Sequence, residues 1–355
     1  MTQTGAAAVG QSRRQASLNM STTSIPLIDI GKFASADERE RARVVAEVRT
    51  ALEDVGFLII GGHGVEQSLI DRVSDASLAF FDRPDSEKMR FCPEKAGSRG
   101  YNAMRGRTVG IAQNSTYLKS LQESYAVGQP DVPDDAWFFT EAAGHRFAKN
   151  IWPDGPSDFE PAMSEYYNAM ARVYRDIMRL FAVALDLPET YFDSAVDKHG
   201  SLLRLTHYPS LDSEPLPGEY RSGAHTDGGA LTILHIDDTP DALQVKLRSG
   251  EWINVNRIPG TFVINIGDMM MRWTNDKWIS NWHRVVNPPF VNGRSKARLS
   301  LVYFCSTNYD TVVECLPNCS GPGNPARYPP IVSGQYAAER FNLRYGIEGP
   351  AARRA

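Results

Sequence analysis

Hydrophobic residues change their spacing along the first quarter of the chain. Residues 25–30 and 57–60 are short apolar runs, which is typical of buried strands. Between them the apolar residues recur every three or four positions, so we expect a helix that ends before Gly56. Ser35 and Glu38 have the spacing of a capping box, which predicts that Ser35 caps the start of this helix.

Two later segments also have the spacing of amphipathic helices. One covers residues 66–81, and a longer one covers residues 160–187 and is stopped by Pro188. Residues 92–158 lie between them, are rich in Gly, Asn, Ser and Pro, and follow neither period. Long irregular stretches inside a domain are uncommon unless they have a function. We therefore expect this stretch to supply residues that contact a substrate.

After Gly200 the pattern changes to short β-rich runs separated by turn residues. These runs are 201–208, 230–236, 242–247, 252–256, 261–266 and 299–304. Such regular short strands predict a sandwich or barrel, and we expect no comparable helix until about Ala337.

The organisation that follows is an α+β protein in four parts. These parts are a disordered tail (1–23), a mixed α/β N-terminal region (24–158), an all-β core braced by the long helix (159–335), and a C-terminal helix and tail (336–355).

Composition and charge narrow the classes of function. The net charge is −4 and basic residues are not clustered, which argues against a nucleic-acid partner. No apolar run is long enough to span a membrane, and the first 23 residues lack the apolar core of a secretory signal. The four cysteines form no C-x-x-C pair, so we expect free thiols and a cytoplasmic location. No protein partner is implied, and a small-molecule substrate is the remaining expectation.

Three residues have the chemistry of a metal site. His225 and Asp227 are two positions apart, so on a strand both side chains would point to the same face. His283 lies 56 residues further on, far enough for intervening strands to return the chain to the same place. Two imidazoles and one carboxylate are the ligand set that suits Fe(II) and leaves open positions on the metal. The H-x-D motif alone is a weak signal.

A second constellation lies on the last predicted strand. Arg298 and Ser300 share one face of that strand with apolar residues. A buried guanidinium needs an anionic partner, and a dicarboxylate could accept from Arg298 with the Ser300 hydroxyl as a further donor. An internal Asp or Glu as partner of Arg298 is the alternative.

Beyond these residues, most of the chain resembles the isopenicillin N synthase-like family of Fe(II)/2-oxoglutarate-dependent dioxygenases. In the N-terminal half the similar segments are Ile25-Pro-Leu-Ile-Asp-Ile30, Ala51-Leu-Glu-Asp-Val-Gly-Phe57, His63-Gly-Val65 and Phe80-Phe-Asp-Arg-Pro84. In the C-terminal half they are Leu203-Arg-Leu-Thr-His-Tyr-Pro209, His225-Thr-Asp227, Ala230-Leu-Thr-Ile-Leu234, Leu243-Gln-Val245, Ile264-Asn-Ile-Gly-Asp268, Trp273-Thr-Asn275, His283-Arg-Val285 and Arg298-Leu-Ser300. The family order of these segments is kept throughout.

The resemblance implies a double-stranded β-helix (jelly-roll) core and a set of site residues. Iron would be held by His225, Asp227 and His283, and 2-oxoglutarate by Arg298 and Ser300, with Tyr208 and Thr206 assisting. The substrate pocket would be formed by residues of the irregular region and two from the core. These are Tyr101, Met104, Arg105, Tyr125, Trp282 and Phe304.

The implied activity is oxidation of a C–H bond of a small molecule in secondary metabolism, by hydroxylation, desaturation or cyclisation. It would consume O₂ and 2-oxoglutarate and release succinate and CO₂. One alternative is a family oxidase that omits 2-oxoglutarate and binds its substrate's carboxylate with Arg298 and Ser300. A zinc hydrolase that uses H-x-D and a distal histidine, or a metal-free binding protein on the same scaffold, are alternatives from other classes.

Overall fold

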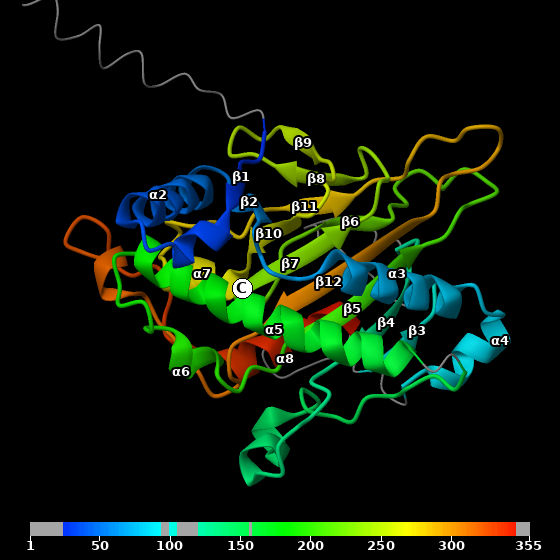
Figure 1. The fold of residues 1–355 in the computed structure, drawn as a ribbon, viewed down its shortest axis with the longest axis horizontal. Helices are drawn as coiled ribbons and strands as arrows, with labels where there is room; N and C mark the ends of the chain where they lie inside the picture. The colour runs from blue at the N-terminus through cyan, green and yellow to red at the C-terminus, as the bar shows by residue number, and fades with distance from the viewer. Residues whose placement is uncertain (1–23, 94–98, 105–119, 156–157, 346–355) are drawn as a thin grey trace, which may run out of the picture.

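The computed structural model describes residues 24–93, 99–104, 120–155 and 158–345, which form helices packed on two β-sheets (Figure 1). The helices are α2 (Glu38–Asp54), α3 (Gln67–Phe81), α4 (Asp85–Lys88), α5 (Phe159–Ala184), α6 (Asp193–Val196), α7 (Asp268–Trp273) and α8 (Ser333–Tyr345). Short 3-10 turns are at Ile30–Ala34, Met89–Phe91, Ala136–Phe139, Glu141–Ala143 and Pro317–Cys319.

The larger sheet contains strands from both halves of the chain. Its spatial order is β1 (Leu27–Asp29), β2 (Phe57–Gly61), β10 (Phe262–Ile266), β7 (Leu231–Ile236), β12 (Arg298–Cys305), β5 (Leu202–Tyr208), β4 (Glu123–Val127) and β3 (Gly100–Asn102). All neighbours in it are antiparallel except β1 and β2. The N-terminal region thus supplies the strands at both edges of this sheet.

The smaller sheet carries two of the candidate metal ligands. Its order is β6 (Ser222–His225), β11 (His283–Val285), β8 (Leu243–Lys246) and β9 (Trp252–Val255). A separate pair is formed by β13 (Val312–Val313) and β14 (Ile331–Val332). The two facing sheets make up the jelly-roll core that the sequence predicted.

The two faces of the larger sheet have different partners. One face packs on the long helix α5, and residues such as Tyr125, Leu205 and Tyr303 belong to the same buried cluster as the apolar side of α5. The other face, which we call the inner face, packs on the smaller sheet. Phe57 and Ile236 of this face belong to a second cluster of buried apolar residues, which also contains residues of strand β8. Figure 1 shows α5 lying across the larger sheet with α3 beside it. Arg298 and Ser300, the residues expected to bind 2-oxoglutarate, lie on this inner face.

Several predicted boundaries need correction. The capping box was wrong, because Asp37 is the N-cap of α2 and accepts from the Arg39 amide at 2.8 Å. Ser35 instead accepts from the Asp37 amide. Helix α7 was missed because six residues are too few for a period to be visible, and α8 begins at Ser333, before the predicted position. The tail 1–23 lies outside the described residues.

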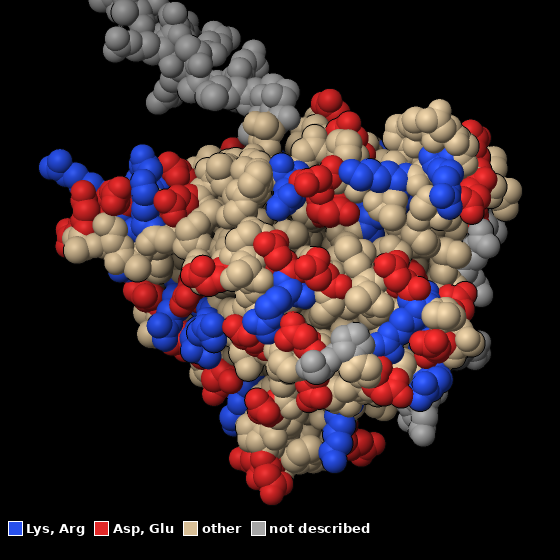
Figure 2. All heavy atoms as spheres, turned by 45° about the vertical axis from the view of Figure 1, so that its right-hand side comes forward, with Lys and Arg blue, Asp and Glu red and all other residues tan. Residues whose placement is uncertain are grey.

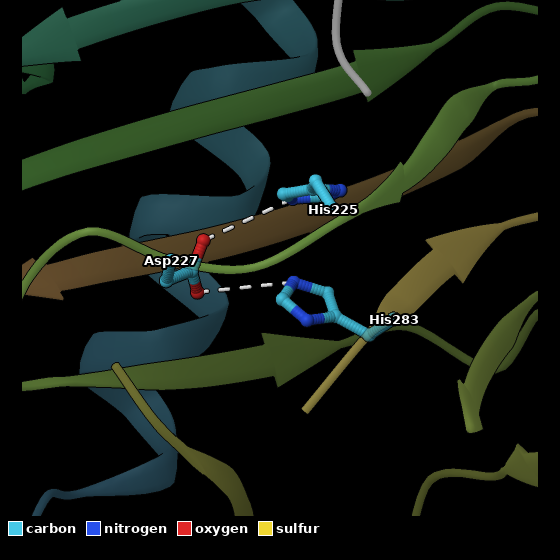
Figure 3. A group of neighbouring side chains, drawn as sticks. All are labelled: His225, Asp227 and His283. Carbon is cyan, nitrogen blue, oxygen red and sulfur yellow. Dashed lines mark ion pairs between the residues drawn. The ribbon is translucent and has the colours of Figure 1, made fainter. Parts of the chain in front are cut away.

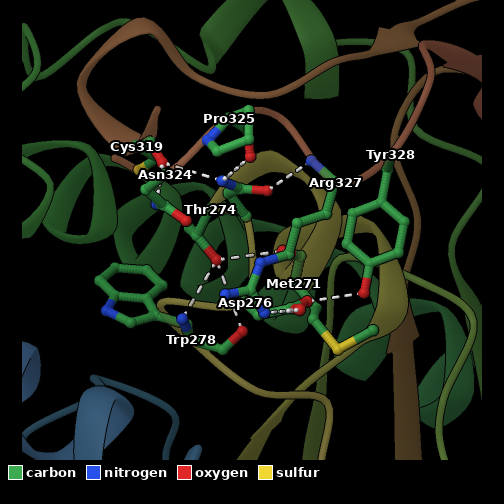
Figure 4. Close-up of polar contacts among 10 residues, drawn as sticks. Met271, Thr274, Asp276, Trp278, Cys319, Asn324, Pro325, Arg327 and Tyr328 are labelled. Carbon is green, nitrogen blue, oxygen red and sulfur yellow. Dashed lines mark hydrogen bonds and ion pairs between the residues drawn. The ribbon is translucent and has the colours of Figure 1, made fainter. Parts of the chain in front are cut away.

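A polar network holds the chain after α7 against the segment 317–328 (Figure 4). The Asn275 amide donates to the carbonyls of Cys319 and Pro325, each at 3.1 Å, and its oxygen accepts from the Arg327 amide at 2.9 Å. Asp276 accepts from the Arg327 guanidinium and the Tyr328 hydroxyl. Asn275 and Asp276 have φ of 52° and 66°, a left-handed conformation that Asn and Asp tolerate. This turn sets the start of the segment that leads to His283.

The surface is mixed in charge. On the face in Figure 2, Lys and Arg are interspersed with Asp and Glu, in keeping with the net charge of −4. Among the described helices, none has both the length and the apolar character to cross a bilayer.

Candidate metal centre and its surroundings

His225 and His283 face each other across two paired strands. His225 is the last residue of β6 and His283 the first of β11, and their Cα atoms are direct partners in the ladder. Their ring centroids are 4.3 Å apart. Asp227 lies two residues beyond the end of β6, so our expectation that it shares a strand face with His225 was wrong. The turn after β6, rather than strand alternation, directs this carboxylate toward the rings.

The ligand atoms of the three residues converge on one point (Figure 3). The Nε2 atoms of His225 and His283 lie 3.8 Å from the Oδ1 and Oδ2 atoms of Asp227, respectively. These distances are too long for hydrogen bonds. Two atoms that each lie about 2.1 Å from one ion can be at most about 4.2 Å apart. The spacing therefore suits a shared divalent metal ion.

Backbone carbonyls orient both imidazoles. The Nδ1 atom of His225 lies 2.8 Å from the carbonyl oxygen of Gly223, and that of His283 lies 3.2 Å from the carbonyl oxygen of Asn281. When each Nδ1 carries the proton and donates it to that carbonyl, the lone pair of Nε2 points into the site. The same orientation is needed for coordination.

The Asp227 carboxylate is buried but ionised. Its Oδ2 atom accepts from the Thr232 hydroxyl at 2.6 Å and from the Asn265 amide at 2.9 Å. Burial by itself raises the pKa of Asp227, but the two histidines and these two hydrogen bonds outweigh it and lower the pKa to about 2. The site thus offers a carboxylate at neutral pH.

Helices α7 and α8 hold the turn that carries Asp227. The Asp268 amide at the start of α7 donates to the Asp227 carbonyl at 2.7 Å. Arg340 of α8 donates to the Thr226 carbonyl at 3.1 Å, and the Asp268 carboxylate accepts from the Tyr336 hydroxyl at 2.6 Å. Gly229 is required here, since a Cβ on it would lie 2.4 Å from the Cys305 carbonyl oxygen. Sequence reasoning missed Arg340 and Tyr336, because no local motif marks them.

The second predicted constellation is a set of buried donors. Arg298 and Ser300 are each 2% exposed. Within the described parts of the chain, the Nε and Nη1 atoms of Arg298 and the hydroxyl of Ser300 have no hydrogen-bond partner. Asp237 is the internal acid that our alternative would require, but its Oδ1 lies 3.8 Å from Arg298 Nε and its oxygens accept from backbone amides. These free donors fit a carboxylate that comes from a ligand.

The other two residues expected around 2-oxoglutarate lie beside them. Tyr208 is the direct ladder partner of Arg298, and Thr206 that of Ser300, so all four side chains share one face. Phe304, on the same face of β12, is opposite Thr232, which bonds Asp227. The predicted co-substrate residues thus lie on the inner face of the larger sheet, which packs on the smaller sheet that carries His225 and His283.

The predicted substrate residues of the irregular region are elsewhere. Tyr125 is the ladder partner of Leu205 and Tyr101 that of Tyr125, which directs both rings toward the helices, away from the inner face. The Tyr101 hydroxyl donates to Glu123, and the Tyr125 hydroxyl donates to the Ile151 carbonyl. Assigning them to the pocket was wrong, because strand register could not be read from the sequence. Met104 is exposed, and Arg105 lies outside the described residues.

Phe304 and Trp282 remain near the metal ligands, and Arg204 joins them. Arg204 is on the inner face two residues before Thr206, and its guanidinium carbon is 5.1 Å from the centre of the Phe304 ring. We missed Arg204, although its alternation with Thr206 and Tyr208 marks the same face. Trp282, next to His283, lines a cavity of about 440 Å³. Other residues that line it are Thr226, Asp268, Arg272, Tyr328 and Tyr336.

Two models of known families match parts of the chain. Residues 25–155 match the model described as "non-haem dioxygenase in morphine synthesis N-terminal". Residues 199–307 match the model of the 2OG-Fe(II) oxygenase superfamily.

Individual proteins are similar over nearly the whole chain. A 2-oxoglutarate-Fe(II) type oxidoreductase, hxnY, of Emericella nidulans is 33% identical and covers 92% of each chain. A homoarginine-6-hydroxylase of Oryza sativa is 33% identical over 89% of this chain and 96% of its own. Among solved structures, a full-length Neurospora crassa protein crystallised in complex with alpha-KG and thymine is 30% identical, with a TM-score of 0.79 over 92% of this chain and 98% of that chain.

Proposed function

The chain belongs to the 2OG-Fe(II) oxygenase superfamily, and on this basis we propose that His225, Asp227 and His283 hold its iron while Arg298 and Ser300 bind 2-oxoglutarate. The protein is a 2-oxoglutarate-dependent non-haem iron dioxygenase. One observation carries the residue assignment: three metal-ligand side chains converge, and the larger sheet has, on the face that packs on the smaller sheet, buried donors without a partner among the described residues.

Bound iron(II) supplies the redox chemistry that couples conversion of 2-oxoglutarate and O₂ into succinate and CO₂ to oxidation of a substrate C–H bond. The residues of the chain prepare the site for it. Thr232 and Asn265 fix the Asp227 carboxylate, and the Gly223 and Asn281 carbonyls fix the two imidazoles.

Arg298 and Ser300 act at the other end, where they anchor the distal carboxylate of 2-oxoglutarate. A guanidinium binds a carboxylate through two parallel hydrogen bonds, which sets orientation as well as affinity. Thr206 and Tyr208 line the same place, supported by their pairing with Ser300 and Arg298. This anchoring keeps the 2-oxo acid end directed toward the metal ligands.

For the substrate we propose a small molecule that contacts Phe304, Arg204 and Trp282. The position of Arg204 above the Phe304 ring supports this, since the pair offers a cationic donor beside an aromatic face. Relatives are named for, or crystallised with, different small molecules, homoarginine and thymine among them, so they support the class rather than one compound.

We also propose that residues 24–158 and 159–335 act as an N-terminal region and a catalytic core, with the enzyme in the cytoplasm. The four cysteines, which are all free, support a reducing compartment.

The test is succinate formation. Purified protein loaded anaerobically with Fe(II) is mixed with 2-oxoglutarate and O₂, and succinate and oxygen consumption are measured, with the Asp227→Ala variant as control. We expect both signals to require 2-oxoglutarate and to vanish in the variant. Oxygen consumption that needs no 2-oxoglutarate would refute the assignment of Arg298 and Ser300.

A further inference from the structure

Arg221, just before strand β6, is a second fully buried arginine near the co-substrate residues. Its Nη2 atom donates to the Lys296 carbonyl. Its Nε and Nη1 atoms have no hydrogen-bond partner in the described parts of the chain. A buried guanidinium with unmet donors is costly for the folded protein. We therefore expect Arg221 to have a partner that the described residues do not supply.

The position of Arg221 links it to Arg298. The guanidinium carbons of Arg221 and Arg298 lie 5.7 Å and 5.4 Å from the centre of one ring, that of Tyr208. The backbone carbonyl that accepts from Arg221 belongs to Lys296, which precedes Arg298 by two residues. Both arginines therefore lie against the ring of Tyr208, the residue that pairs with Arg298 across the two strands.

The charges around Tyr208 do not balance. Among described residues, Asp237 is the one carboxylate whose charge acts on both arginines. Burial lowers the pKa of Arg221 to about 10, so its guanidinium is still protonated at neutral pH. Two buried cations thus share one partly exposed acid, and Arg204 adds a further positive charge near Tyr208, so positive charge is in excess here. A ligand carboxylate would reduce this excess.

We propose that Arg221 is a second cationic residue of the 2-oxoglutarate pocket and donates to the distal carboxylate that Arg298 and Ser300 bind. This inference rests on the proposed function. A carboxylate has about four acceptor positions, enough for two hydrogen bonds from Arg298, one from Arg221 and one from the Ser300 hydroxyl. Two cations around the distal end favour a dicarboxylate over a 2-oxo acid that has no second carboxylate.

The experiment compares two ligands on the Mn(II)-loaded protein by calorimetry. 2-Oxoglutarate carries the distal carboxylate, whereas 2-oxobutyrate lacks it. Loss of a charge-assisted hydrogen bond predicts that Arg221→Met raises the Kd of 2-oxoglutarate by about 10- to 100-fold. The Kd of 2-oxobutyrate should stay within about threefold of wild type. Arg221→Lys should be intermediate for 2-oxoglutarate, because it keeps the charge but not the fork.

A matched control separates this role from a structural one. Arg99 is also buried but lies near Tyr167 of α5, and Arg99→Met should leave both affinities unchanged. The melting temperature of ligand-free Arg221→Met should equal or exceed that of wild type, while its rise on adding 2-oxoglutarate should shrink.

Each unfavourable outcome has its own meaning. Equal weakening of both ligands, or an unchanged Kd for 2-oxoglutarate, overturns the role of Arg221 alone. Failure of the wild-type protein to bind 2-oxoglutarate overturns the proposed function itself.

Discussion

Replacing Arg298 by Met would measure what the buried donors of the inner face contribute. Its Nε and Nη1 atoms are the donors left without a protein partner among the described residues. Two charge-assisted hydrogen bonds to a carboxylate are together worth about 3–6 kcal/mol. We therefore expect Arg298→Met to raise the Kd of 2-oxoglutarate by about 10²- to 10⁴-fold.

Without ligand, Arg298→Met should not be less stable than wild type, although it binds 2-oxoglutarate more weakly. Among the described residues, the buried cation in wild type has a loose ion pair with Asp237, at 3.8 Å, and the nearby Tyr208 ring to offset its desolvation. Met has a similar length and no charge, so we expect the free energy of unfolding without ligand to stay equal or to rise. The partly exposed Asp237 carboxylate can be solvated by water once Arg298 is gone.

Denaturant unfolding with and without 2-oxoglutarate tests both parts at once. At a ligand concentration of 100 times the wild-type Kd, wild type should gain about 2.7 kcal/mol, and a variant with a 100-fold higher Kd about 0.4 kcal/mol. Wild type and Arg298→Met would be compared as Mn(II)-loaded proteins. The gain in unfolding free energy that 2-oxoglutarate gives Ser300→Ala is expected to lie between theirs. A ligand-free loss above about 2 kcal/mol would instead mark Arg298 as an internal structural cation and refute the reasoning.

Four further predictions concern the surroundings of the site. Thr232→Val removes a hydrogen bond to Asp227 and should weaken Co(II) binding by about 10- to 100-fold in a spectroscopic titration, with unchanged binding counting against this role. Arg340→Met frees the turn that carries Asp227 and should weaken Co(II) binding in the same assay while leaving unfolding nearly unchanged. Tyr125→Phe should lower stability by about 1 kcal/mol and leave 2-oxoglutarate turnover intact, whereas lost turnover would return Tyr125 to the pocket. Burial lowers the pKa of His199 to about 4, so this residue binds a proton in the unfolded chain, but not in the folded chain, between about pH 6.5 and 4. Its contribution to the unfolding free energy should therefore fall by about 3 kcal/mol across that range, and the pH dependence of unfolding in His199→Phe should be smaller by that amount.

Long regular features of this fold could be predicted from the sequence. The helix expected over residues 160–187 is α5, Phe159–Ala184, because several turns of one period outweigh local noise. The strand expected over residues 252–256 is β9, within one residue at its end. Short elements failed for the same reason: β11 has three residues and α7 six, too few to establish a period.

The site could be predicted in its residue types but not in its register. His225, Asp227 and His283, whose ligand atoms the structure brings together, were predicted from their residue types combined with the resemblance to a known family, because the H-x-D motif alone is a weak signal. Tyr101 and Tyr125 looked equally suitable for a pocket, yet a shift of one position would be needed to turn them to the inner face. Contacts between distant segments, such as that of Arg340 with Thr226, leave no trace in a single sequence.

Strand β12 connects the two ends of the site. Its even-numbered side chains, from Arg298 to Phe304, point to the inner face, while Leu301 and Tyr303 pack toward α5. Ser300 and Phe304 are four residues apart, about 13 Å along the strand. Because one strand carries both the anchoring donors and the aromatic residue opposite Thr232, their separation is fixed by backbone geometry. The proposed pocket is therefore suited to a short dicarboxylate held in one orientation.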